Sequence, residues 1–296
     1  MLTIAYLANE FPCAVEPYVG EEIDELRRRG IQVLTGSVRK PQAAYDAPEV
    51  VLQTLSRVVL RQAAWLCLRR WNRIAPLIGR ALFHGPENPW QRLKALAHTF
   101  LGACYAVLLE NRGVEHIHVH HGYFGSWIGM AAARLMDVGF SMTLHGSDLL
   151  LHGTYLDVKL ERCSFCLTVS EYNRRYILEN YPKLDQRKIA VTRLGVDVPQ
   201  PGGSGALKSK AHADPFTLLA VGRLHAVKNH AFLLRACAVL RLSMFPLNAL
   251  SRARGRSAVV WNRSSGSADS KDESLCWVIY RGSKWIRCMT GPMSWR

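Results

Sequence analysis

The sequence predicts an α/β protein: a complete parallel sheet covered by helices in the first part, then the start of a second domain of the same kind. Three observations support this fold class. Short apolar segments of strand length alternate with longer segments of helical length. A stretch rich in Pro, Gly, Ser and Ala, residues 199–215, then interrupts the pattern. With 296 residues, of which 49% are hydrophobic and 21% charged, the chain can bury one large core or two modest ones.

The first domain is expected to span residues 1–198 and to be Rossmann-like. Apolar runs predict strands at residues 3–8, 32–36, 116–120, 141–144, 165–169 and 188–192. Helices are expected near residues 19–29, 93–111, 126–136 and 171–180. Gly30 directly after the first helix is a typical C-terminal helix signal.

The second part of the chain changes character twice. Residues 199–215 are expected to be a linker, and residues 216–242 an incomplete domain with a strand at 216–221 and a helix at 231–242. Residues 243–296 show no period and carry nine Lys or Arg against three acids. We expect them to form an irregular basic tail that is not natively folded, from out-of-frame translation or divergence.

The formal net charge of +15 raises the affinity of the chain for phosphates, nucleic acid or anionic lipid, without indicating which of them it binds. No acidic residue occurs between Val50 and Pro86. The same segment interleaves six arginines and two tryptophans with aliphatic residues: Arg57, Arg61, Arg69, Arg70, Arg73 and Arg80, with Trp65 and Trp71. Such a segment suits an anionic membrane surface. It equally suits a helix that packs its apolar face on a sheet with Arg in solvent, so both interpretations stay open.

The chain has no uninterrupted run of 18 apolar residues, and residues 2–7 lack the charged flank and cleavage site of a signal peptide. We therefore expect a cytoplasmic protein, peripheral on the inner face of the plasma membrane if the membrane interpretation holds. The eight cysteines are scattered, most of them in apolar segments, which argues against a disulfide framework. Cys163 and Cys166 form a lone C-x-x-C before a strand, where neither redox nor zinc chemistry is expected.

The strongest functional signal follows the strand of the second part. Gly222 and Arg223 end that strand, and Lys228 and Asn229 precede a helix. This spacing brings two cations and backbone amides to a helix N-terminus, where diphosphate oxygens are stabilised. The alternative is a solvated Arg and Lys in a turn.

A second signal lies at the end of the strand at residues 141–144. Ligands of open α/β sheets bind beyond the carboxyl ends of the strands, so His145 should face the cleft. Asp148, three residues later, either caps the next helix or contacts substrate.

The run from His116 to His121 allows two interpretations. Alternation places His116, His118 and His120 on one face of a strand, where they could bind a metal. A catalytic zinc site usually adds a carboxylate, and none is indicated by the sequence. The other interpretation places His118 and His120 at a ligand cleft.

These motifs together resemble glycosyltransferase family 4, and three further segments match it in order. They are Asn9 to Tyr18 with Glu16, Leu167 to Asn173 with Ser170, and Gly195 to Asp197. The first of them is similar to capsular, colanic-acid and exopolysaccharide-type members. The resemblance covers about residues 1–241. It departs from the family at Asn229, where Gly is common; Asn also tolerates a left-handed backbone.

The resemblance implies a GT-B fold of two Rossmann-like domains and transfer of a sugar from a nucleotide-sugar donor to a polysaccharide or lipid-linked acceptor with retained configuration. It implies no metal and no cofactor, because Arg223 and Lys228 hold the diphosphate together with Gly222. It places His145 beside the transferring sugar. It assigns the acceptor side of the cleft to His118, His120, Glu16, Tyr18, Asp148 and Ser170.

The family also uses two donor-domain glutamates eight positions apart, whereas the only Glu after Leu242 is Glu273. We therefore expect a truncated or frameshifted donor domain and impaired activity. Two other functions remain as alternatives: a metal-dependent hydrolase built on His116 to His121, and a basic protein that binds nucleic acid through its Arg-rich helix and tail.

Overall fold

The computed structural model describes residues 2–13, 16–41, 48–195, 216–223, 228–229, 232–233, 235–236, 239–240, 247–254, 275–281 and 284–287. In the strands of the second part it describes the backbone and, apart from Ala220, no side chains. The chain divides into two compact units, residues 1–198 and 199–296, and each is treated by itself. The boundary falls where the linker was expected to begin, but residues 196–215 lie outside the described part.

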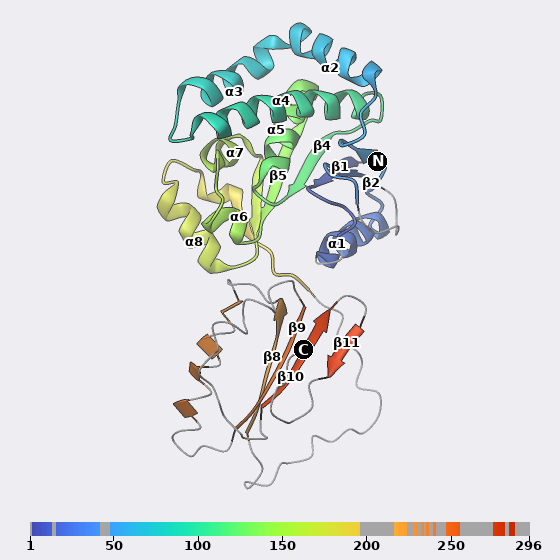
Figure 1. The fold of residues 1–296 in the computed structure, drawn as a ribbon. Helices are drawn as coiled ribbons and strands as arrows, with labels where there is room; N and C mark the ends of the chain where they lie inside the picture. The colour runs from blue at the N-terminus through green and yellow to red at the C-terminus, as the bar shows by residue number, and fades with distance from the viewer. Residues whose placement is uncertain are drawn as a thin grey trace. The chain divides into compact units, whose positions relative to one another are not determined.

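The first unit contains a seven-stranded sheet with the order β3-β2-β1-β4-β5-β6-β7 (Figure 1). All of its neighbouring strands pair in parallel. The strands are β1 (Thr3–Ala8), β2 (Gln32–Ser37), β3 (Val50–Val51), β4 (His116–His120), β5 (Gly139–Leu144), β6 (Phe165–Thr168) and β7 (Ile189–Val191). The order reverses between β1 and β4, and this switch point is where open α/β sheets form a crevice at their carboxyl ends.

Eight helices and one short 3₁₀ helix connect these strands in the described part of the first unit. They are α1 (Pro17–Arg28), α2 (Arg57–Arg69), α3 (Trp71–Phe83), α4 (Pro89–Leu109), α5 (Phe124–Met136), α6 (Ser147–Leu150), α7 (Leu156–Arg162), α8 (Glu171–Asn180) and η1 (Gln186–Lys188). Asn88 and Gln91 form a capping box at the start of α4, and Ser170 caps α8.

The side chains of β1 alternate between two cores. Ala5 and Leu7 pack into the large core with α4 and α5, whereas Tyr6 and Ala8 pack with α1 on the other face. On the first face, α2 and α3 lie outside α4, so this side of the sheet carries two layers of helices (Figure 1). The rings of His118 and His120 contact Tyr6 and so lie on the α1 face.

One described helix, α4, is long and apolar enough to cross a membrane by length and composition. It packs against both α5 and α2, and residues such as Ala103, Cys104 and Tyr105 are fully buried. A helix covered on two sides needs an apolar surface inside a water-soluble fold as well. We interpret α4 as the central helix of this core.

The Arg-rich segment forms two helices, α2 and α3, that meet at Arg70 and Trp71. Three of its six arginines bond inside the unit and do not extend into solvent as a charged face. Arg70 donates to the Leu135 carbonyl, Arg73 pairs with Asp137, and the guanidinium of Arg80 lies 2.9 Å from Glu87 and 2.8 Å from Asp157. The sequence analysis could not predict the pairings with Leu135, Asp137 and Asp157, because these partners are more than 60 residues away along the chain.

The second unit contains a four-stranded sheet with the order β11-β10-β9-β8. Its strands are β8 (Phe216–Arg223), β9 (Leu247–Arg254), β10 (Leu275–Arg281) and β11 (Lys284–Arg287). β8, β9 and β10 pair in parallel, and β11 is antiparallel to β10. Three of these strands lie within residues 243–296, where the sequence analysis expected an irregular tail, and the other residues of that range lie outside the described part.

The predicted elements of the first unit agree closely with those observed. β1, β4 and α8 have the predicted bounds, and α1 ends at Arg28 with Gly30 at a φ of 82° as the C-terminal signal required. The sequence analysis missed β3, α6, α7 and the division of residues 57–83 into two helices, because all of these are short or set by tertiary contacts.

Candidate active site

The carboxyl edge of the sheet brings two of the predicted histidines together. β4 ends at His120 and β5 ends just before His145, and the two strands are neighbours in the sheet. Nδ1 of the fully buried His120 lies 3.3 Å from Nε2 of His145. Tyr18 on α1 covers the pair, with its ring centroid 4.9 Å from that of His145. The strand ends, the first turn of α1 and the loop after β5 thus form one cluster.

Asp148 holds the loops of this cluster in place. Its carboxylate accepts backbone N–H groups from Gly122 (2.8 Å), His145 (3.1 Å) and Gly146 (2.7 Å). It does not act as the N-cap of α6, which is Gly146 without a side-chain cap. Burial alone would raise the pKa of Asp148, but His121 and the backbone donors outweigh it and lower the pKa to about 2. Asp148 is therefore an ionised structural anchor between the loops after β4 and β5.

His121 is the one histidine of the run that the structure holds between two carboxylates. Its Nε2 lies 3.0 Å from Glu16 and its Nδ1 lies 3.6 Å from Asp148. Its φ of 71° is left-handed, and this turn at the end of β4 directs the ring away from the strand's alternation. Burial lowers the pKa of His121, but the interactions with Asp148 and Glu16 outweigh it and raise the pKa to about 9. His121 is therefore a cation at neutral pH.

The neighbouring histidines are neutral at the same pH. Burial, followed by the charge of His121, lowers the pKa of His145 to about 4. Burial lowers the pKa of His118 to about 3 and that of His120 well below its usual range. A neutral imidazole has one N–H donor and one acceptor nitrogen. His145 can therefore exchange hydrogen bonds with an uncharged hydroxyl without bringing a charge to it.

The side chain of His118 is buried within the sheet. Its Nδ1 lies 2.7 Å from the Ser141 hydroxyl and its Nε2 lies 3.0 Å from the Thr143 hydroxyl, both on β5. His116 also contacts Ser141, at 2.6 Å. The predicted alternation of these side chains is present. Its result, however, is a hydrogen-bonded row along β4 and β5.

Among the described residues, one group has the spacing of metal ligands: Glu22 of α1 with His118 and His120. The carboxylate that the sequence analysis could not find is thus supplied by a helix. Both nitrogens of His118 already bond to hydroxyls, so a metal ion would have to replace one of those bonds. The arrangement favours hydrogen bonding over a metal centre, and we build no step on a metal.

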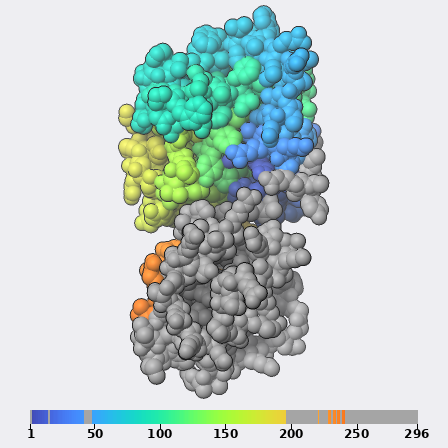
Figure 2. All heavy atoms as spheres, viewed as in Figure 1, coloured from blue at the N-terminus to red at the C-terminus, as the bar shows by residue number. Residues whose placement is uncertain are grey.

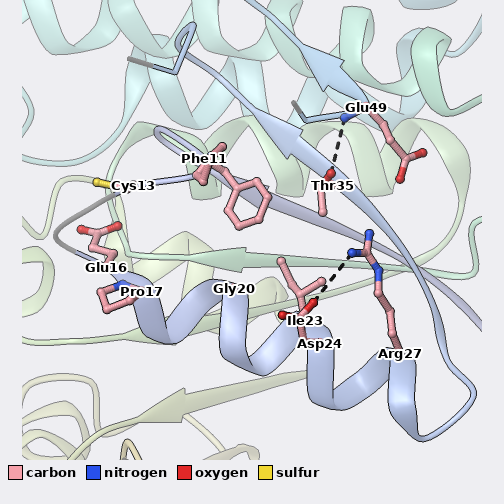
Figure 3. Close-up of a pocket in the computed structure, with 11 residues that line it drawn as sticks. Phe11, Cys13, Glu16, Pro17, Gly20, Ile23, Asp24, Arg27, Thr35 and Glu49 are labelled. Carbon is pink, nitrogen blue, oxygen red and sulfur yellow. Dashed lines mark hydrogen bonds and ion pairs between the residues drawn. The ribbon is translucent and has the colours of Figure 1, made fainter. Parts of the chain in front are cut away.

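A cavity of about 290 Å³ lies next to this cluster and shares Glu16 with it. Figure 3 shows Asp24 and Arg27 of α1 on one side and Thr35 and Glu49 on the other, with Phe11 beside them. The lining combines carboxylates, a guanidinium, a hydroxyl and an aromatic ring. Such a mixture suits a polar ligand with hydroxyl groups.

The other predicted site residues lie on elements described separately. Ser170 ends the loop after β6, and its hydroxyl accepts the Asn173 N–H at 3.2 Å, which is a capping role. In the second unit, Gly222 and Arg223 end β8, and the side chain of Arg223 lies outside the described part. Lys228 is exposed. Asn229 has a φ of 46°, the left-handed conformation for which Gly is common, and its side chain accepts the Phe232 N–H.

Cys163 and Cys166 are buried structural thiols. Burial raises the pKa of Cys163 to about 11 and that of Cys166 well above its usual range. Neither sulfur is a thiolate at neutral pH, so neither has the reactivity of a redox cysteine.

The sequence analysis missed Glu22, Tyr6 and His121 as members of the cluster. Tyr6 donates a hydrogen bond of 2.6 Å to Glu22, whose other oxygen lies 3.5 Å from His120. One signal was present, because Glu22 is four residues after Tyr18 and lies on the same face of α1.

The comparison with protein families agrees with this geometry. The profile of Glycosyltransferase Family 4 matches residues 15–200, which is more than half of the chain and includes the cluster around His145 except Tyr6. The chain belongs to this glycosyltransferase family. A search of curated proteins gives no match.

Solved structures show that the fold of this family member is the α/β GT-B type. Sucrose-phosphate synthase from Thermosynechococcus elongatus has a TM-score of 0.55 at 14% identity, over 94% of this chain and 70% of that one. MurG from Acinetobacter baumannii has a TM-score of 0.51 at 14% identity, over 95% and 66%. The catalytic domain of starch synthase IV from Arabidopsis thaliana, bound to ADP and acarbose, has a TM-score of 0.52 at 12% identity, over 96% and 75%. The chain thus spans two thirds to three quarters of these proteins.

Proposed function

We propose that this family member transfers a sugar from a nucleotide-sugar donor to a polysaccharide or lipid-linked acceptor, with retained configuration and without a metal ion or cofactor. The observation that carries the proposal is the cluster at the carboxyl edge of the sheet, where a neutral His145 stands beside His120 and Tyr18. The family match over residues 15–200 supports it. Solved structures of similar fold with UDP-glucose and with ADP and acarbose support the donor class.

The roles follow from charge and position. His145 would bond a hydroxyl of the transferring sugar, while Glu16 and Tyr18 would line the acceptor side. Arg223 and Lys228 would stabilise the departing diphosphate, with backbone amides near Gly222 completing the phosphate site. Catalysis would then consist of positioning and electrostatic stabilisation of the leaving group.

We also propose that donor turnover needs groups that residues 243–296 do not supply. The expected pair of donor-domain glutamates has only Glu273 as a candidate member in this range. The test uses two proteins: the 296-residue chain, and a chimera that joins residues 1–198 to the donor domain of a related family member of known donor. Release of nucleoside diphosphate is measured with the known donor and a polysaccharide or lipid acceptor.

The chimera should turn over its donor, and His145→Ala in the chimera should lower kcat by about 10²-fold or more, as loss of a transition-state hydrogen bond does. His84→Ala, an exposed histidine after α3, is the matched control and should have no effect. A folded chimera without turnover would contradict the transferase function. Turnover by the 296-residue chain would contradict only the requirement for other donor-domain groups.

The location we propose is the cytoplasmic side of a membrane, with the outer face of α2 and α3 as the contact surface. Trp65, Leu68 and Trp71 are 66%, 71% and 53% exposed, which is unusual for side chains of this size. Arg57, Arg61 and Arg69 are exposed beside them, and no acid lies on either helix. Figure 2 shows these helices, blue to cyan, on the outer surface of the first unit.

Vesicle flotation tests the membrane contact. Binding to vesicles with anionic phospholipid should exceed binding to neutral ones, because both apolar burial and charge contribute. Trp65→Ser with Leu68→Ser should abolish flotation, whereas Tyr172→Ser on α8, also an exposed aromatic, should not. Equal failure of the wild-type chain on both kinds of vesicle would remove this part of the proposal.

A further inference from the structure

Four side chains, from β1, α1, β4 and the loop after β5, form a continuous chain of polar contacts that ends at His145. The Tyr6 hydroxyl on β1 donates to Glu22 Oε1 at 2.6 Å. Glu22 Oε2 on α1 lies 3.5 Å from His120 Nε2. His120 Nδ1 lies 3.3 Å from His145 Nε2. Each contact uses a different atom, so the four groups can bond in sequence.

The chain has a direction because its first member has a fixed role. Burial raises the pKa of Glu22, whereas the hydrogen bond that the Tyr6 hydroxyl donates opposes this shift, favours the carboxylate and fixes its position. A carboxylate accepts only, so the nitrogen that faces it should carry a proton. His120 Nε2 makes no hydrogen bond among the described residues, so its buried N–H would be costly without the neighbouring anion, Glu22 Oε2 at 3.5 Å.

The proton positions of both rings follow from this direction. A neutral His120 with its proton on Nε2 has a lone pair on Nδ1. The contact with His145 is then a hydrogen bond only if His145 Nε2 carries the proton and donates. His145 is left with its lone pair on Nδ1 and presents an acceptor at that atom.

We propose that Glu22 is a positioning residue that sets, through His120, which nitrogen of His145 carries the proton. This inference rests on the proposed function for its meaning: a His145 that accepts at Nδ1 selects a ligand group that donates, such as a sugar hydroxyl. It concerns the protein without substrate, so it can be tested even if the transferase function is wrong. Glu22 itself does not touch the reacting atoms.

Glu22→Gln should change which nitrogen carries the proton in both histidine rings. When the Tyr6 hydroxyl donates to the amide oxygen at the Oε1 position, as it does to the carboxylate, the amide NH₂ turns toward His120. His120 Nε2 must then accept, its proton moves to Nδ1, and His145 Nε2 becomes the acceptor. The His145 proton therefore moves to Nδ1. An isosteric change two residues away along this relay thus reverses what His145 offers to a ligand.

The experiment is long-range ¹H–¹⁵N NMR of the full chain labelled at histidine nitrogens, near pH 7. A ring nitrogen that carries a proton and one that does not resonate far apart, so each tautomer is read directly. The signals of His120 and His145 are assigned from His120→Asn and His145→Gln spectra. In the wild type both rings should be protonated at Nε2.

In Glu22→Gln the Nδ1 and Nε2 resonances of His145 should exchange positions, and in Glu22→Ala the two tautomers of His145 should both be populated. Glu21→Ala, an exposed glutamate on the same helix, is the matched control and should leave every histidine signal unchanged. A wild-type His145 protonated at Nδ1 would overturn the proposal without any variant. His145 remaining protonated at Nε2 in both folded Glu22 variants would overturn it as well.

Discussion

Asp148→Asn should destabilise the first unit strongly, because the carboxylate is the anchor of two loops. A pKa of about 2, against the ordinary 3.8, corresponds to roughly 2.5 kcal/mol of stability at neutral pH. The amide also directs an N–H group at the backbone donors of Gly122 or Gly146, which adds the cost of an unmet hydrogen bond. We expect a loss of about 2–4 kcal/mol in the free energy of unfolding.

Urea unfolding followed by far-UV circular dichroism measures this loss, since the long described helices all lie in the first unit. For a unit of this size the melting temperature should fall by about 5–10 °C. Asp24→Asn on α1, whose side chain is 73% exposed, is the matched control and should stay within about 0.5 kcal/mol of the wild type.

The pH dependence provides an independent check of the same reasoning. The folded-state pKa of Asp148 is lowered, so its contribution is present above the unfolded pKa near 3.8 and is lost as the pH falls toward 2. The difference between wild type and Asp148→Asn should therefore shrink in that window. A variant as stable as the wild type at pH 7 would refute the role of Asp148 as an anchor.

Two further predictions concern packing and charge. Gly102→Ala on α4 should lower the free energy of unfolding by about 1–3 kcal/mol, because the added Cβ would lie 2.6 Å from a side chain of α5. Gly79→Ala on α3 meets nothing within 4 Å and should raise the free energy of unfolding by about 0.5–1 kcal/mol. Equal thermal shifts of the two variants would contradict this reasoning. His121 has a raised folded-state pKa, so its contribution is complete below about pH 6.5 and is lost as the pH rises through about 9. The stability advantage of the wild type over His121→Gln should therefore decline across that range in urea unfolding at several pH values. The comparison with the variant is needed because burial lowers the pKa of Lys159 to about 7, so the contribution of Lys159 to stability rises with pH. A stability difference between wild type and variant that does not change with pH would show that His121 is not held as a cation.

The sequence predicted β1 and β4 with their observed bounds because a buried parallel strand is a short apolar run with clear limits. It also placed His120 and His145 at strand ends, and parallel pairing then forces such residues to the same edge of the sheet. Local sequence patterns are therefore enough to predict the fold class and the proximity of the two histidines. Tail strands such as β9 were missed because their segments carry no such pattern.

The tertiary structure decided which partner each polar group meets. Glu22 reaches His120 only because α1 packs on the Tyr6 face of the sheet, and a sequence separation of 98 residues carries no trace of that contact. Asp148 looked like a helix cap because its position fits one, yet the left-handed turn at His121 brings other donors to its carboxylate. The sequence by itself determined the sheet, the strand ends and the family. The protonation states of the histidine cluster depend on burial and on neighbouring charges. The burial and the neighbouring charges exist only once α1, β4 and the loop after β5 have packed together.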